Sequence, residues 1–226
     1  MSRVYDLFVA GGPVMYPLLG LSIATFACAF ERGWFWFRLT SQEDRVVHDV
    51  LEAAVQDLGK AAELAKQAQD LAIGRFLLAP LKLNQPSPET FHLAMEAAAD
   101  KEFVQMRKGD KLLETVIAIA PLLGLLGTVT GLIITFGSLQ IGGGNSADVN
   151  IAAAGIGEAL ITTAAGMIVA IIALFFFRIF VSLQSQQMDY FSSVGSELEL
   201  IYRQVWYEPA QGANMSQRFI EQDGGK

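Results

Sequence analysis

The stretch GIGEALITTAAGMIVAIIALFFF, residues 155–177, carries one charged residue, Glu158, in a run that stays uncharged up to Arg178. An apolar run of this length is typical of a transmembrane helix, which needs about 20 mostly apolar residues. A charge at the centre of a bilayer costs about 2.5–3.5 kcal/mol on insertion scales. The carboxyl of Glu158 therefore needs a neighbouring helix, water or a proton, and it is a candidate functional group.

Two further uncharged runs, residues 14–30 and 115–147, have the composition of membrane helices. The whole chain of 226 residues is 52% hydrophobic and 17% charged. That balance is too apolar for an ordinary soluble domain. We predict an all-α membrane protein with three transmembrane helices and long cytoplasmic helical extensions.

The positive charges predict the orientation of the chain. Of the 16 Lys and Arg residues, only Arg3 precedes the first run, and residues 140–150 contain none. By the positive-inside rule, the N-terminus and the loop between the last two spans face outward. The expected parts are a periplasmic segment 1–12, transmembrane helix 13–37, cytoplasmic helical segment 38–111, transmembrane helix 112–140, short periplasmic loop 141–150, transmembrane helix 151–180, cytoplasmic helix 181–207 and flexible C-terminal tail 208–226.

The cytoplasmic parts show helical patterns with interruptions. Apolar residues recur at helical spacing from Val47 to Leu58, and Gly74 and the stretch LNQPSPET (83–90) interrupt the pattern. Ser87 and Pro88 predict a helix start, with serine as the cap and proline in the first turn. We expect that helix to run without a break into the second span.

A heptad spacing follows the third span, at Phe191, Val194, Leu198, Ile201 and Val205. This spacing is typical of a helix that packs along one seam. The partner across the seam is either the cytoplasmic part of the same chain or another subunit.

Small residues recur four apart in the last two spans, at positions where helices could approach closely. Such residues let helix backbones come together in lipid. The predicted helix-packing positions are Gly124, Gly127, Gly131, Gly155, Ala159 and Gly166. Glu158 shares a face with Thr162, Gly166 and Ala170, so this face should point toward other helices or a water-filled cavity.

Other functions fit these residues less well. A passive scaffold, in which polar residues only hold helices together, is one alternative. An intramembrane enzyme would need a nucleophile–base pair or a metal set, and one glutamate with threonines supplies neither. Cys28 is alone, and His48 and His92 lack metal-ligand spacing, so we expect no catalytic, metal or cofactor site.

Two motifs carry a family resemblance: APLLGLLGTVTG (120–131) and GIGEALITTAAGM (155–167), together with the Glu31-Arg32 pair after the first span. Their order and spacing resemble the MotA/TolQ/ExbB proton-channel family, and within it the ExbB/TolQ branch. The resemblance covers most of residues 14–180.

The resemblance implies a homopentamer in a bacterial inner membrane, around a dimer of a single-span ExbD- or TolR-like partner. Proton flow would drive work on a periplasm-spanning TonB- or TolA-like protein. By motif match, Thr128, Glu158 and Thr163 fall on pore-lining positions of the proton pathway. TonB-dependent import is the expected role and TolQ-like envelope maintenance the alternative, without enzymatic activity, cofactor or nucleic acid.

Overall fold

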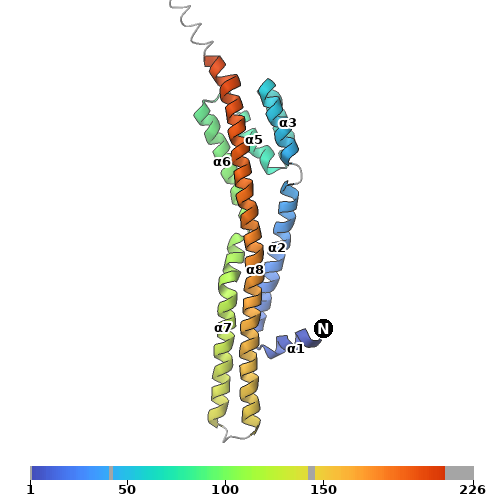
Figure 1. Ribbon diagram of the computed structural model, residues 1–226, viewed down its shortest axis with the longest axis vertical. Helices are drawn as coiled ribbons and strands as arrows, with labels where there is room; N and C mark the ends of the chain where they lie inside the picture. The colour runs from blue at the N-terminus through green and yellow to red at the C-terminus, as the bar shows by residue number, and fades with distance from the viewer. Residues whose placement is uncertain (1, 41–42, 142–145, 212–226) are drawn as a thin grey trace, which may run out of the picture. The chain divides into compact units, whose positions relative to one another are not determined.

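The computed structural model describes residues 2–40, 43–141 and 146–211, and within these residues the chain is helical without a strand. Figure 1 shows the helices along the chain. They are α1 (Ser2–Ala10), α2 (Met15–Thr40), α3 (Glu43–Gln56), α4 (Leu58–Gln67), α5 (Ala72–Leu81), α6 (Pro88–Met106), α7 (Asp110–Ile141), α8 (Ser146–Ile201) and a π-helix, η1 (Tyr202–Tyr207).

The chain divides into two compact units, which we describe separately. The first unit comprises the described parts of Met1–Trp34 and Gly109–Val181, and the second those of Phe35–Lys108 and Ser182–Lys226. The long helix α8 contributes its N-terminal part to the first unit and its C-terminal part to the second.

The first unit leaves many large apolar side chains exposed, and small residues are among those that it buries. Ala120, Ala159 and Ala173 are buried, and the first two contact glycines of the facing helix, Gly166 and Gly131. Large side chains are exposed on the same helices, among them Leu122, Leu125, Ile133, Leu160, Ile168 and Ile171. Exposed apolar surface on this scale indicates contact with lipid or with other proteins rather than with water.

Two helical stretches, Pro88–Gly137 and Ala153–Gln211, are long and apolar enough to cross a membrane. Only 22% of the most apolar window of each is buried, unlike the core helix of a soluble protein. The first expected span forms the helix α2, but α2 is not one of these two stretches; its uncharged run ends at Glu31 and Arg32.

The expected continuous helix from Pro88 into the second span is wrong. The helix α6 ends at Met106, and α7 begins at Asp110. Between them Gly109 has φ +90°, a left-handed conformation that ends helices and favours glycine. A Cβ atom on Gly109 would lie 2.8 Å from Sγ of the buried Cys28, so close packing also requires the glycine.

The ends of three expected segments differ from the prediction. The segment 1–12, expected in the periplasm, contains the helix α1, for which the sequence analysis made no prediction. The expected loop 141–150 is helical from Ser146 onward, and residues 142–145 lie outside the described residues. The chain continues as a helix through residues 208–211, and the rest of the expected flexible tail, 212–226, also lies outside the described residues.

Between residues 47 and 74 the helices begin and end at other residues than the apolar pattern predicts. Asp57 separates α3 from α4, because its side chain accepts hydrogen bonds from the backbone N–H groups of Gly59 and Lys60, at 2.8 and 3.3 Å. Val55, in the last turn of α3, is exposed. Gly74 lies inside α5 instead of interrupting a helix: a Cβ atom there would collide with the backbone carbonyl of Ala68.

The predicted start of α6 is confirmed. The Ser87 hydroxyl accepts a hydrogen bond from the Thr90 N–H at 3.2 Å, and Pro88 is the first residue of the helix. This cap satisfies one of the N–H groups that have no partner within the helix.

The heptad residues of α8 pack mainly against their own chain. Phe191, Val194 and Leu198 are buried, and the Phe191 ring lies 4.8 Å from that of Phe76 on α5. The predicted seam then stops, because the chain enters the π-helix η1 and Val205 is 41% exposed. Of the two possible partners, the same chain covers the first three positions.

Candidate functional site

The helices α7 and α8 approach one another along small residues, which we call the glycine seam: Gly124, Gly127 and Gly131 of α7, and Gly155, Ala159 and Gly166 of α8. A Cβ atom on Gly131 would lie 2.7 Å from the carbonyl oxygen of Gly155, and one on Gly166 would lie 2.5 Å from that of Ala120. Real Cβ atoms do not approach backbone oxygens so closely, so the seam requires glycine at these positions. This packing takes place within one chain.

Two threonines fill the notches that glycines leave on the opposite helix. Thr162 of α8 lies against Gly127 of α7, and Thr135 of α7 lies against Gly155 of α8. The hydroxyl of Thr162 donates to backbone carbonyls of its own helix, and that of Thr135 donates to the Gly131 carbonyl at 2.9 Å. Both hydroxyls are thus satisfied locally, and their role at the seam is to fill space.

The three predicted pore-lining residues lie at the edges of this seam and are half-buried. The Thr163 hydroxyl donates to the Gly124 carbonyl across the helix pair, at 3.0 Å. The Thr128 hydroxyl donates to the Leu125 carbonyl of its own helix, at 2.6 Å. Thr163 therefore links the two helices, a role that the sequence pattern did not indicate.

Glu158 lies against the turn that joins α1 and α2. A Cβ atom on Gly12 would collide with the Glu158 carboxylate and lie 2.7 Å from its Cδ. Gly12 also has φ +68°, a conformation that costs a non-glycine residue free energy. Only glycine meets both conditions, so Gly12 positions the backbone beside the carboxylate.

Sequence reasoning missed Gly12 and the packing role of Thr162, whereas Thr135 shares its four-residue spacing with Gly127 and Gly131. The dipeptide Gly11-Gly12 before Pro13 was an available signal for a tight turn. Its proximity to Glu158 could not be read from the sequence, because 146 positions separate the two residues along the chain.

The second unit holds two buried carboxyl groups outside the seam. Arg75 donates two hydrogen bonds to Glu102, from Nε at 2.7 Å and from Nη2 at 2.6 Å, and this bonding raises the pKa of Arg75. Glu43 accepts a hydrogen bond from Nε2 of Gln187 at 2.5 Å. Burial raises the pKa of Glu43 to about 7, although the bond from Gln187 acts in the opposite direction.

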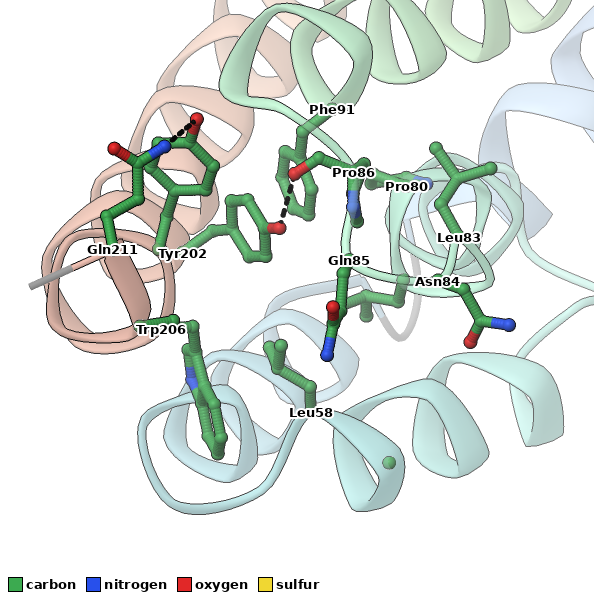
Figure 2. Close-up of a pocket in the computed structure, with 14 residues that line it drawn as sticks. Leu58, Pro80, Leu83, Asn84, Gln85, Pro86, Phe91, Tyr202, Trp206 and Gln211 are labelled. Atoms are coloured by element: carbon green, nitrogen blue, oxygen red, sulfur yellow. Dashed lines mark hydrogen bonds between the residues drawn. The ribbon is translucent and has the colours of Figure 1, made fainter. Parts of the chain in front are cut away.

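The second unit also contains a cavity of about 690 Å³, whose walls combine aromatic and amide side chains with leucines and prolines (Figure 2). Tyr202 stacks on Phe91 with ring centroids 4.3 Å apart and donates to the Pro86 carbonyl at 2.6 Å. Trp206 donates to the Ala54 carbonyl at 2.8 Å. These bonds hold the cavity wall in place.

No group of three or more potential metal ligands occurs in the part of the chain that the structure describes. His92 lies 2.9 Å from the carboxylate of Glu199, and His48 lies 3.8 Å from that of Glu52. Each histidine is therefore next to a carboxylate of its own unit.

Known proteins resemble this chain over most of its length. A Synechocystis protein called ExbB-like 1 is 73% identical over 210 residues, which is 92% of this chain and 83% of the relative. Another Synechocystis protein, ExbB-like 3, is 36% identical over 203 residues, covering 90% and 97% of the two chains. The Tol-Pal system protein TolQ of Haemophilus influenzae is 31% identical over 114 residues, covering 50% and 49%.

Residues 68–193 match the sequence profile of a family described as the MotA/TolQ/ExbB proton channel family. The matched range contains α7, the glycine seam and Glu158. Members of this family are channel or transport components. Together with the two ExbB-like relatives, the match shows that this chain belongs to the MotA/TolQ/ExbB proton channel family, in its ExbB branch.

Proposed function

We propose that the chain is the channel subunit of an inner-membrane complex that converts the proton motive force into mechanical work. The observation that carries this proposal is the placement of Glu158. Its carboxyl is half-buried, and it is the one charged group between Asp148 and Arg178 of α8. A carboxyl in such surroundings is a functional group by default, because lipid would exclude it.

In this proposal Thr128, Glu158 and Thr163 line the proton pathway. All three are half-buried within one chain, so their free sides are available to water or to a partner. Glu158 would accept or pass protons. Thr163 would in addition keep α7 and α8 together through its bond to the Gly124 carbonyl.

The proposed assembly is a homopentamer around a dimer of a single-span ExbD- or TolR-like protein. The glycine seam does not support the pentamer, because it is used inside the chain. Support comes from the exposed apolar side chains of α7 and α8, such as Leu125, Ile133 and Ile168, which neighbouring subunits and lipid could cover.

The proposed topology is three crossings by α2, α7 and α8, with the N-terminus in the periplasm and the C-terminus in the cytoplasm. The distribution of lysine and arginine supports this orientation. The second unit, with its buried ion pair and its aromatic core, would then be the cytoplasmic part.

Energising TonB-dependent import through a TonB-like protein is the preferred role. The ExbB-like relatives align with about nine-tenths of the chain, whereas the TolQ of Haemophilus influenzae aligns with half of it. Envelope maintenance with a TolA-like protein is the second candidate, and the TolQ match favours it.

The test is to reconstitute the chain into liposomes with its single-span partner and to measure proton flux under an imposed gradient. Glu158→Ala should keep the assembly and abolish flux, since the variant span is more apolar and inserts at least as well. Thr128→Val should reduce flux. Thr130→Val is the matched control. The Thr130 hydroxyl, like that of Thr128, donates to a carbonyl of its own helix, that of Gly127 at 3.0 Å. Thr130 is not a predicted pore-lining residue, so its substitution should leave flux unchanged.

Wild-type flux in the Glu158→Ala complex would contradict the proposed role of this carboxyl. A complete complex that never conducts protons, with or without its energised partner, would favour a passive scaffold. Native mass spectrometry of the same preparation tests the pentamer, and a folded monomer would exclude it.

A further inference from the structure

Glu43 is a buried carboxyl that the proposed proton pathway does not use. It is the first residue of α3 and is 4% exposed. Its Oε2 accepts a hydrogen bond from Gln187 of α8, at 2.5 Å. Its Oε1 is buried and has no hydrogen-bond partner among the residues that the structure describes. An ionised Glu43 would thus be a buried charge with a single neutral donor.

The neighbouring carboxylate of Asp44 opposes a negative charge on Glu43, and the cation Arg45 on the same helix is exposed to solvent. Asp44 follows it in the chain, and the Tyr190 hydroxyl of α8 donates to the Asp44 carboxylate at 2.8 Å. Burial and that bond raise the pKa of Tyr190, so the phenol stays neutral. Farther along the groove between α3 and α8 lie His48, Glu52 and Glu197.

On the other helices packed against α3, each arginine or lysine is either bonded to a carboxylate other than Glu43 or exposed to solvent. Those helices are α4, α5 and η1. Arg75 of α5 is bonded to Glu102, and Arg203 of η1 is bonded to Glu199. The two lysines of α4, Lys60 and Lys66, are exposed to solvent.

Burial therefore decides the protonation of Glu43. A buried charge is stabilised only by opposite charges or several donors, and a group without them keeps its neutral form. Burial is the largest influence and Asp44 adds to it, while the bond from Gln187 opposes both; the resulting pKa is about 7. The partial positive charge at the start of α3 favours ionisation, but it is a smaller effect than burial.

We propose that Glu43 is a second proton-binding site of the chain, and that release of its proton loosens the contact between α3 and α8. The neutral carboxyl packs between the helices with its carbonyl oxygen bonded to Gln187. Ionisation would draw water toward Oε1 and place a charge beside Asp44. The site lies in the second unit and does not depend on the proposed channel function.

The direction of the pH effect follows from linkage. The pKa of Glu43 is raised from 4.5 to about 7 by folding. The folded chain therefore binds the proton more tightly, by roughly 300-fold at one decade per pKa unit. This stabilisation is complete below about pH 4.5, declines as the pH rises, and is lost above about pH 7.

The experiment uses the full-length protein in lipid nanodiscs. Infrared difference spectra across a pH titration detect the C=O stretch of a protonated carboxyl. Hydrogen exchange of α3 amides, corrected for intrinsic rates, reports the α3–α8 contact. The variants are Glu43→Gln, which keeps the shape and cannot ionise, and Glu52→Gln, whose exposed side chain lies on the same helix.

The wild type and Glu52→Gln should show a carboxyl band that disappears near pH 7, with protection of α3 falling by severalfold over the same range. Glu43→Gln should lack that band and keep its protection at high pH. A wild-type spectrum without a carboxyl titrating between about pH 6 and 8 would overturn the proposal, even if Glu43→Gln did not fold. A band as intense in a folded Glu43→Gln protein as in the wild type would overturn it as well, and Glu158→Gln shows which part of any remaining band belongs to Glu158.

Discussion

The glycine seam makes a quantitative prediction about a single methyl group. In Gly127→Ala the new Cβ atom would meet Thr162, whose Cβ lies 2.5 Å and Cγ2 3.0 Å away. These atoms belong to a short, β-branched side chain at the middle of a helix, so they cannot rotate away. Overpacking of this kind costs about 1–3 kcal/mol.

The same substitution also has a favourable effect, which a control can measure. Alanine stabilises a helix interior by about 1 kcal/mol relative to glycine. Gly137, also on α7, has no atom within 4 Å of its added Cβ. Gly137→Ala should thus be neutral or stabilising, and Gly127→Ala should be less stable than Gly137→Ala by about 1–3 kcal/mol.

Steric trapping measures the difference in stability between the two variants. Biotin labels are placed on outward-facing positions of α7 and α8, and the binding of streptavidin reports separation of the two helices. Thr162→Gly removes the obstructing side chain, so in a double-mutant cycle it should relieve at least about 1 kcal/mol of the cost of Gly127→Ala. Equal stabilities for Gly127→Ala and Gly137→Ala, or a cycle without coupling, would refute the proposed contact.

Three further outcomes are expected. Glu158→Gln keeps shape and hydrogen bonding but cannot ionise; in the flux assay it should be nearly as inactive as Glu158→Ala if the residue handles protons, and largely active if it only lines the pore. Arg75→Ala should destabilise the second unit by about 2–4 kcal/mol in thermal unfolding, because it leaves the buried carboxylate of Glu102 unpaired, whereas Arg75→Ala combined with Glu102→Leu should recover most of that loss. In the steric-trapping assay, α7 and α8 should separate more readily in Thr163→Val than in Thr163→Ser. The free energy of separation should be lower by about 1 kcal/mol, because valine lacks the hydrogen bond to the Gly124 carbonyl.

The sequence predicted those features that depend on local composition. The apolar runs predicted the long helices. Ser87 and Pro88 predicted the start of α6, because capping depends on neighbouring residues alone. The family motifs led to the correct family, since APLLGLLGTVTG and GIGEALITTAAGM are specific in combination.

Features that depend on distant contacts could not be predicted in the same way. Glycine is typically a helix breaker, but Gly74 lies within a helix. Glycine is required there because the Ala68 backbone approaches closely. Gly109 was hidden in a long helical pattern, and its left-handed conformation beside Cys28 became apparent only in the structure. Gly12 and Glu158 lie in contact although they are far apart along the chain, and no local sequence pattern reveals such a contact.

The two threonines of the glycine seam also fix the register of the hairpin. They point in opposite directions, Thr162 into the notch of Gly127 and Thr135 into that of Gly155. If α8 slid by one helical turn so that Thr162 met Gly131, Thr135 would move from a glycine to the level of Glu158 and Ala159, where side chains occupy the space. A slide in the other direction would take Thr162 out of the notch of Gly127 to the level of Leu123. The hairpin is thus locked against sliding by a helical turn, so we expect α7 and this part of α8 to keep their register.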